Sequence, residues 1–187
     1  KRDIHPIIGC EVYIAPRSMK DKEAHTDSNY AHLILLAENH QGYQNLMKLV
    51  SIGFLEGFYY KPRIDYEILS KYHDGLICLS ACIAGDIPRL LLDGQYDRAK
   101  GLALKLNDIF GDGNFYLEIQ NHGLKEQIMV NDLLVKLSRE TNIPLVATND
   151  IHYVRREDAK AHDVLLCIQT GKTIEDEDRM KFETDEF

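Results

Sequence analysis

The chain has 187 residues, of which 44% are hydrophobic, so it can bury the core of a sizeable globular domain. Its formal net charge of −8 argues against a segment that holds nucleic acid by charge alone, because such surfaces need clustered Lys and Arg. There is no apolar run of the roughly 18 residues that a membrane span needs, no signal peptide and no Cys-x-x-Cys pair, so we expect an intracellular protein with reduced thiols and no membrane segment.

Five short apolar runs rich in Ile, Leu and Val predict buried β-strands. They cover residues 7–14, 32–37, 75–80, 115–119 and 145–148. Because the runs are almost continuously apolar, we expect parallel strands that are covered on both faces. The first run follows closely on the charged opening Lys-Arg-Asp, and we expect the chain to begin inside a longer protein.

Amphipathic segments separate these runs and predict helices. The expected helices cover residues 42–56, 65–72 with Asp65 as N-cap, 85–92, 95–110, 125–141, and a last one from Arg155 to about Gly171. Strand and helix therefore alternate about five times. This alternation excludes a β-sandwich and favours a doubly wound sheet or a (β/α) barrel.

Two stretches lack this regular pattern. Residues 16–30 are polar and interrupt the first strand-to-helix step, which predicts a surface insertion. Residues 174–187 are acidic and have no apolar period, which predicts a connector toward a following domain. We therefore expect one domain over residues 1–173 and a connector over 174–187.

Asp150 and His152 follow the last predicted strand and are two residues apart. With extended backbone, both side chains leave the strand on one face. A carboxylate and an imidazole in one small volume can bind a divalent cation. The alternative is an Asp that caps the next helix and a partly exposed His.

Three further polar residues interrupt or flank the strands: Glu11, His32 and Cys82. A carboxylate in the middle of a strand needs a cation or a hydrogen-bonding network, because its burial costs several kcal/mol. The alternatives are a Glu11 that faces solvent at the sheet edge, a hydrogen-bonded core histidine and a buried, inert cysteine. The carboxyl ends of parallel strands collect functional groups, so we expect these three residues to share one site with Asp150 and His152.

Two residues are candidates for a catalytic role. His122, which with Glu118 lies at the fourth predicted strand and its exit, could be a proton donor, a phosphate contact or simply a turn histidine. Arg63 lies in a loop before a helix, where it could contact phosphate, although pairing with a neighbouring acid is the commoner role. No glycine-rich nucleotide loop and no Gly-x-Ser-x-Gly motif is present, so nucleotide cradling and serine hydrolysis have no anchor.

Seven motifs occur in a distinctive order along the chain. They are Ile8-Gly-Cys-Glu-Val-Tyr13, His32 with Ala37-Glu-Asn39, Phe58-Tyr-Tyr-Lys-Pro-Arg-Ile-Asp65, Leu79-Ser-Ala-Cys-Ile-Ala-Gly85, Tyr116-Leu-Glu-Ile-Gln-Asn-His-Gly123, Ala147-Thr-Asn-Asp-Ile-His-Tyr153 and His162-Asp-Val-Leu-Leu-Cys-Ile-Gln-Thr-Gly-Lys172. In this order they resemble the polymerase-and-histidinol-phosphatase (PHP) domain family, in the branch found at the start of bacterial DNA polymerase III alpha subunits.

The resemblance implies most of a distorted (β/α)₇ barrel, with about five parallel βα units and the first strands missing. It implies up to three divalent metals, usually zinc or manganese, at the strand ends. Carried over residue by residue, it places Glu11, His32, Cys82, Asp150 and His152 on metal-ligand positions of the family. The family's first motif, His-x-His followed by Asp, is expected upstream of Lys1, so we expect the isolated fragment to be inactive.

The resemblance also implies a parent protein, which is a replicative DNA-directed DNA polymerase in the bacterial cytoplasm. Its PHP domain would remove nucleotides 3′ to 5′, and its partners would be DNA, the sliding clamp, the clamp loader and a proofreading subunit. One alternative is a structural PHP scaffold that buttresses the polymerase or docks that subunit. Another is a free-standing PHP phosphatase that acts on a phosphomonoester such as histidinol phosphate.

Overall fold

A computed structural model of the protein describes residues 3–182. The end of the predicted connector, residues 183–187, and the first two residues lie outside the described residues. The strands are β1 Gly9–Ile14, β2 Ala31–Ala37, β3 Arg63–Ile64, β4 Leu76–Leu79, β5 Phe115–Ile119 and β6 Leu145–Ala147. The helices are α1 His40–Leu55, α2 Tyr66–Lys71, α3 Asp86–Leu92, α4 Tyr96–Phe110, α5 Lys125–Thr141 and α6 Ala159–Thr170, preceded by the 3₁₀ helix η1 Arg156–Asp158.

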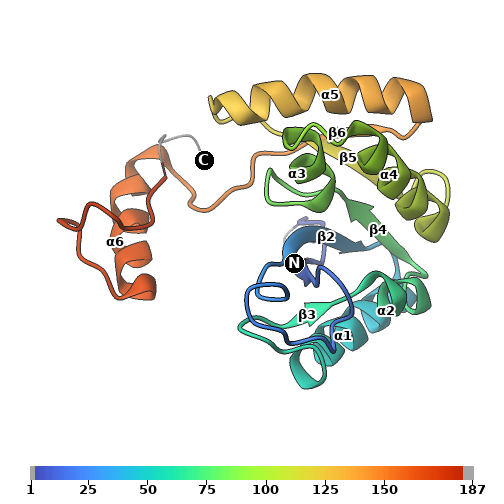
Figure 1. The fold of residues 1–187 in the computed structure, drawn as a ribbon, viewed down its shortest axis with the longest axis horizontal. Helices are drawn as coiled ribbons and strands as arrows, with labels where there is room; N and C mark the ends of the chain where they lie inside the picture. The colour runs from blue at the N-terminus through green and yellow to red at the C-terminus, as the bar shows by residue number, and fades with distance from the viewer. Residues whose placement is uncertain (1–2, 183–187) are drawn as a thin grey trace.

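The strands form one sheet in the order β3-β1-β2-β4-β5-β6 (Figure 1). This mixed sheet with its helices confirms the predicted α/β class. One strand direction differs from the expectation, because β2 is antiparallel to both β1 and β4 while the other pairs are parallel. The connection from β1 to β2 contains no helix, and an antiparallel neighbour does not need a helical crossover.

The sheet is covered unequally on its two faces. Along β2, Leu33 and Leu35 are buried, whereas the alternating residues His32 and Ile34 are only half-buried. Side chains alternate between the faces of a strand, so one face packs into the core and the other is more open. The expectation of parallel strands covered on both faces is therefore wrong for β2, because its apolar run continues on the open face.

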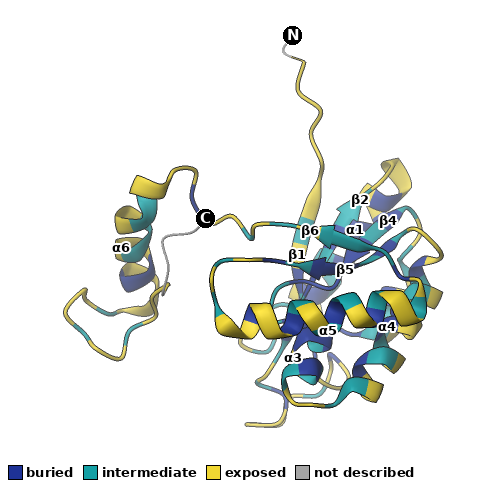
Figure 2. Cartoon of the chain, turned by 90° about the horizontal axis from the view of Figure 1, so that it is seen from above, coloured by how far each residue is buried: buried dark blue, intermediate teal, exposed yellow. Residues whose placement is uncertain are grey.

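The core lies between the closed face of the sheet and the helices. Leu35 of β2, Leu49 of α1, Phe115 of β5 and Leu134 of α5 are at most 1% exposed and belong to one cluster. Full burial of one such side chain stabilises the fold by about 1.5–3 kcal/mol. Helix α5 turns its other face to solvent (Figure 2), as its predicted amphipathic pattern requires.

The predicted insertion, residues 16–30, forms neither helix nor strand but is anchored to the sheet. Asp65 caps α2 as predicted, because one carboxylate oxygen accepts a hydrogen bond from the Ile68 amide at 2.9 Å. Its second oxygen accepts from the Met19 amide, also at 2.9 Å. One side chain therefore begins a helix and fixes the insertion.

Helix α6 lies apart from the sheet, after an irregular segment that follows β6 (Figure 1). Arg179 pairs with Asp163 of α6, and Lys172 pairs with Asp178 at 2.9 Å. The described part of the predicted connector thus folds back on α6, and the boundary at residue 173 stays a prediction. Among residues 3–182, no helix combines the length and the apolar character that crossing a bilayer requires.

Candidate functional site at the carboxyl edge of the sheet

The polar residues singled out in the sequence gather at one edge of the sheet. Cys82, His122 and Asp150 each follow a parallel strand, namely β4, β5 and β6. His32 is near the start of β2, and it reaches the same edge because β2 runs in the opposite direction. A parallel β2 would have placed His32 at the far edge, so the antiparallel direction completes the site.

The side chains of Glu11 and Cys82 both approach one ring nitrogen of His32. His32 Nδ1 lies 3.2 Å from Glu11 Oε1 and 3.8 Å from Cys82 Sγ. Tyr13 pairs with His32 across β1 and β2, so Glu11, two residues before Tyr13, shares the open face with His32. Hydrogen bonding to Cys82 and then to Glu11 raises the pKa of His32 to about 9, and the same contact with His32 lowers the pKa of Glu11.

A pocket of about 330 Å³ brings most of the predicted site together. Its size falls at the lower end of the range for small-ligand sites in proteins. The residues that line it are His32, Cys82, Ile83, His122, Leu124, Gln127, Asp150, His152, Met180 and Phe182. Glu11 reaches this group through His32, whereas Arg63 lies elsewhere.

The segment that carries Asp150 and His152 is a turn and not an extended strand. Strand β6 ends at Ala147, and Asp150 has a left-handed φ of 47°. The same-face argument from extended backbone is therefore wrong for these two residues, although both line the pocket. The helix-cap alternative is also wrong, because the N-cap of η1 is Arg155.

The two strand carboxylates are buried to different degrees. Glu11, whose burial we predicted, has a side chain that is 36% exposed, while Glu118 of β5 is only 5% exposed. The short strand β3 pairs with β1 only at Tyr13 and Ile14, so Glu11 lies beyond this pairing, and the alternative of a Glu at the sheet edge agrees with its exposure. The argument that a buried carboxylate needs a partner therefore applies to Glu118, which we had not included among the site residues.

Glu118 belongs to a buried polar network. Its Oε1 accepts hydrogen bonds from Gln120 Nε2 at 3.1 Å and from the Thr148 hydroxyl. Its backbone amide donates to Ser80 Oγ at 2.8 Å. Burial is the largest influence on the carboxyl and raises the pKa of Glu118, while the bonds from Thr148 and Gln120 act in the opposite direction.

His122 is held by hydrogen bonds at both ring nitrogens. Gln127 Nε2 donates to Nδ1 at 2.8 Å, so Nε2 carries the proton and donates to the Asn149 carbonyl. Gln127 Oε1 in turn accepts from the His122 amide at 2.7 Å. The ring therefore joins the exit of β5 to the turn before Asp150, and a role as proton donor stays a prediction that this arrangement does not favour.

Arg63 is fully buried away from the pocket. Its guanidinium donates to the backbone carbonyls of Gly57, Met19, Asp21 and Asp27 at 2.6–3.2 Å. It holds the insertion against β3, and burial lowers the pKa of the guanidinium. A fully buried donor set that already has partners does not suit the predicted phosphate contact.

The donor chemistry of the pocket suits a divalent cation. Glu11, His32 and Cys82 offer oxygen, nitrogen and sulfur around one point, and Asp150 and His152 add two further donors to the pocket. Within the described part of the chain, however, no three His, Cys, Asp or Glu side chains are arranged as ligands of one metal ion. The residues thus form a partial donor set whose assignment as metal ligands stays a prediction.

The sequence of the chain is similar to sequences of known proteins. Residues 1–122 match the family model of the PHP domain. The chain is 54% identical over its full length to the DNA polymerase III subunit alpha of Borreliella burgdorferi, and 51% identical over 98% of its length to that of Treponema pallidum. It is 49% identical over 98% of its length to that of Thermus aquaticus. The chain spans only 15–16% of the length of these three relatives.

Proposed function

The chain belongs to the PHP domain family, and we propose that its pocket is part of a metal-dependent phosphoesterase site in a DNA polymerase III alpha subunit. PHP domains are generally metal-dependent, and the relatives that match the whole chain carry the alpha-subunit name. The substrate of this site would be the 3′ end of a DNA strand. The polymerase activity itself would belong to the longer protein.

One observation carries this proposal. His32 Nδ1 lies between the Glu11 carboxylate and the Cys82 thiol, on the pocket that Asp150 and His152 also line. Ligands of three chemical types at a strand edge are costly to bring together without a cation, since each must give up water. The proposal therefore assigns Glu11, His32, Cys82, Asp150 and His152 as the ligands that this chain contributes.

Each residue of the proposed site would have its own role in the reaction. A divalent metal, zinc or manganese, would polarise a phosphoryl oxygen and activate water near neutral pH. Glu11, His32 and Cys82 would hold the metal together, and His122 would fix the turn before Asp150 through the Asn149 carbonyl. Met180 and Phe182 would limit the access of water on the outer side of the pocket.

The partners in this proposal are those of a bacterial replicase acting in the cytoplasm. DNA would be held mainly by other parts of the longer protein, because this chain has a net charge of −8. The sliding clamp, the clamp loader and a proofreading subunit would be protein partners of the same assembly.

A structural scaffold is the second candidate function. His32 Nδ1 already has protein partners in Glu11 and Cys82, and the described side chains form no complete metal-ligand group. A domain held together in this way could support the polymerase or dock another subunit without catalysis. A metal that serves folding alone is compatible with this candidate.

The two candidates can be separated with the complete protein. We would incubate it with 3′-end-labelled single-stranded DNA and Zn²⁺ or Mn²⁺, beside the His32→Ala and Asp150→Asn variants. The phosphoesterase proposal expects trimming of the 3′ end by the natural protein and its loss in both variants, with polymerase activity retained as the control for folding. Metal binding without any trimming would support the scaffold.

A further inference from the structure

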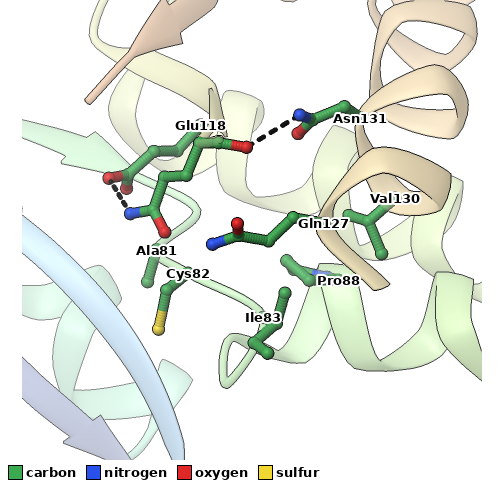
Figure 3. Close-up of a pocket in the computed structure, with 9 residues that line it drawn as sticks. Ala81, Cys82, Ile83, Pro88, Glu118, Gln127, Val130 and Asn131 are labelled. Carbon is green, nitrogen blue, oxygen red and sulfur yellow. Dashed lines mark hydrogen bonds between the residues drawn. The ribbon is translucent and has the colours of Figure 1, made fainter. Parts of the chain in front are cut away.

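A small cavity lies behind Cys82, between β5 and the helices α3 and α5 (Figure 3). It is separate from the larger pocket but shares Cys82, Ile83 and Gln127 with it. Glu118 and Gln120 of the buried network line its inner side. Its volume is about 10 Å³.

Two acceptor atoms of residues that line this cavity accept no hydrogen bond within the described part of the chain, although the Ala81 backbone amide is close enough to the Glu118 carboxyl to lower its pKa. They are Glu118 Oε2 and Gln120 Oε1, and their residues are 5% and 7% exposed. The other polar atom of each side chain, Glu118 Oε1 or Gln120 Nε2, already has hydrogen-bond partners. Gln120 Nε2 donates to Glu118 Oε1 at 3.1 Å and to Thr148 Oγ1 at 3.1 Å. Neither side chain can turn to satisfy its free oxygen without breaking these bonds.

A buried acceptor that loses water without gaining a partner costs about 1–3 kcal/mol, and more when it is charged. Two such acceptors facing one cavity call for a molecule that carries at least two donors. A cavity of about 10 Å³ is close to the smallest space that holds a single water molecule, about one probe sphere. Water carries two donors, so it suits both the chemistry and the size of this cavity.

We propose that this cavity binds one water molecule, which donates to Glu118 Oε2 and Gln120 Oε1, and that Glu118 is thereby fixed as a positioning residue for the Asp150–His152 segment. The water site is inferred from the cavity and from the two oxygens that accept no hydrogen bond. The positioning role rests on the proposed function, because it concerns residues assigned there as metal ligands.

The Glu118 network reaches the segment of the proposed ligands through Thr148, and a separate set of contacts reaches it through His122. Glu118 Oε1 accepts from the hydroxyl of Thr148, which lies two residues before Asp150. Gln127, which lines both cavities, holds the His122 ring that donates to the Asn149 carbonyl. Both contacts end on the turn that departs from β6, but only the Thr148 contact starts at Glu118, so Glu118 acts on the position of Asp150 and His152 through Thr148.

The Glu118→Gln substitution tests this role with little change in shape. The new amide keeps one oxygen for Thr148 and Gln120, but its other end becomes a donor that can no longer accept from the water. Residues that orient metal ligands from behind typically change metal affinity by 10–100-fold. We therefore expect the variant to lose about tenfold or more in Co²⁺ affinity, with a melting temperature close to that of the natural protein.

Co²⁺ titration of the complete protein supplies the first readout. A thiolate bound to Co²⁺ gives a charge-transfer absorption, and its loss in Cys82→Ser shows that the band reports this site. The matched control is Asn45→Ala in α1, which removes a part-buried hydrogen bond of 2.9 Å to the Asp74 carbonyl and lines neither cavity. It should lower stability without changing the affinity for Co²⁺.

Crystal structures of the natural protein and of Glu118→Gln supply the second readout. We expect one water between the two oxygens in the natural protein, and a displaced 148–152 turn in the variant. If the natural protein gives no Co²⁺ band but shows the water and the displaced turn, the proposed function fails and this inference holds. A cavity without that water, or equal Co²⁺ affinities in the two proteins, would overturn it.

Discussion

Arg63 and Glu118 are both buried charged side chains, and their surroundings differ in one respect. The Arg63 guanidinium makes four hydrogen bonds to backbone carbonyls of the insertion and its neighbours. Glu118 has partners for one carboxylate oxygen, while the other faces a cavity next to the candidate site. The sequence had suggested the opposite assignment, with Arg63 as the catalytic candidate.

The difference shows how a buried charge can be classified. A charge whose hydrogen-bonding groups are matched by backbone atoms holds the chain together, since any ligand would have to displace those bonds. A charge that keeps a free acceptor beside a pocket is available to a small molecule. We therefore interpret Arg63 as part of the framework and Glu118 as part of the site.

The largest effect should come from Arg63→Ala. The substitution would leave four buried carbonyls without their donor, and we expect it to lower the free energy of unfolding by about 3–5 kcal/mol in urea. Arg98→Ala, on the exposed side of α4, should change it by less than about 0.5 kcal/mol. If Arg63→Ala left stability intact and reduced metal affinity, the division between framework and site would be wrong.

The second effect concerns pH. Cys82 and Glu11 raise the pKa of His32 from 6.5 to about 9. The contribution of protonated His32 to the free energy of unfolding is therefore fully present below pH 6.5, and it is lost as the pH rises to about 9. A metal at this nitrogen must displace that proton, so its affinity should rise about tenfold per pH unit up to about pH 9. Isothermal titration between pH 6 and 8.5 would measure this slope.

Glu11→Gln provides the control for the pH effect. Loss of the carboxylate should lower the pKa of His32, so that the affinity levels off at a lower pH. A flat pH profile in the natural protein would mean that His32 is not a ligand.

The third effect comes from Thr148→Val, which removes the hydroxyl that donates to Glu118 Oε1. The side chain keeps its shape, so we expect a stability loss of about 1–2 kcal/mol and a fall in metal affinity of about tenfold. Calorimetric melting and metal titration would give the two quantities. A loss of stability alone would place Glu118 with Arg63 in the framework.

The smallest effect should come from Asn131→Ala in α5. Asn131 donates to the backbone carbonyl of Gln120 at 2.8 Å, one step farther from the site than Thr148 (Figure 3). We expect about 1 kcal/mol of lost stability and less than about threefold lost metal affinity. An affinity loss equal to that of Thr148→Val would show that the position of α5, and not Thr148, controls the turn.

The elements of the fold were largely predictable because their periodic patterns are strong. Strand β5 and helix α5 have the limits that the apolar spacing indicates, and Asp65 is the N-cap of α2. The two-residue strand β3 was missed, since its length gives no period. The direction of β2 was also missed, because it depends on the path of residues 16–30, which carry no regular pattern.

The candidate site was predictable in part. His32 was selected although it begins a strand, and only the antiparallel direction of β2 brings it to Cys82. The sequence could not tell which strand carboxylate would be buried, because burial depends on the neighbours of each strand. Glu118 and Gln120, two polar residues on one face of an apolar strand, were the available signal for the network that we missed.

The most direct test of the metal site is anomalous X-ray diffraction from crystals of the complete protein soaked in Zn²⁺. We predict at least one anomalous peak within bonding distance of His32 Nδ1 and Cys82 Sγ, on the pocket that Asp150 and His152 line. The same peak should disappear in crystals of Cys82→Ser. Zinc peaks confined to other parts of the protein, with His32 still paired to Glu11 and Cys82, would contradict the proposed metal site.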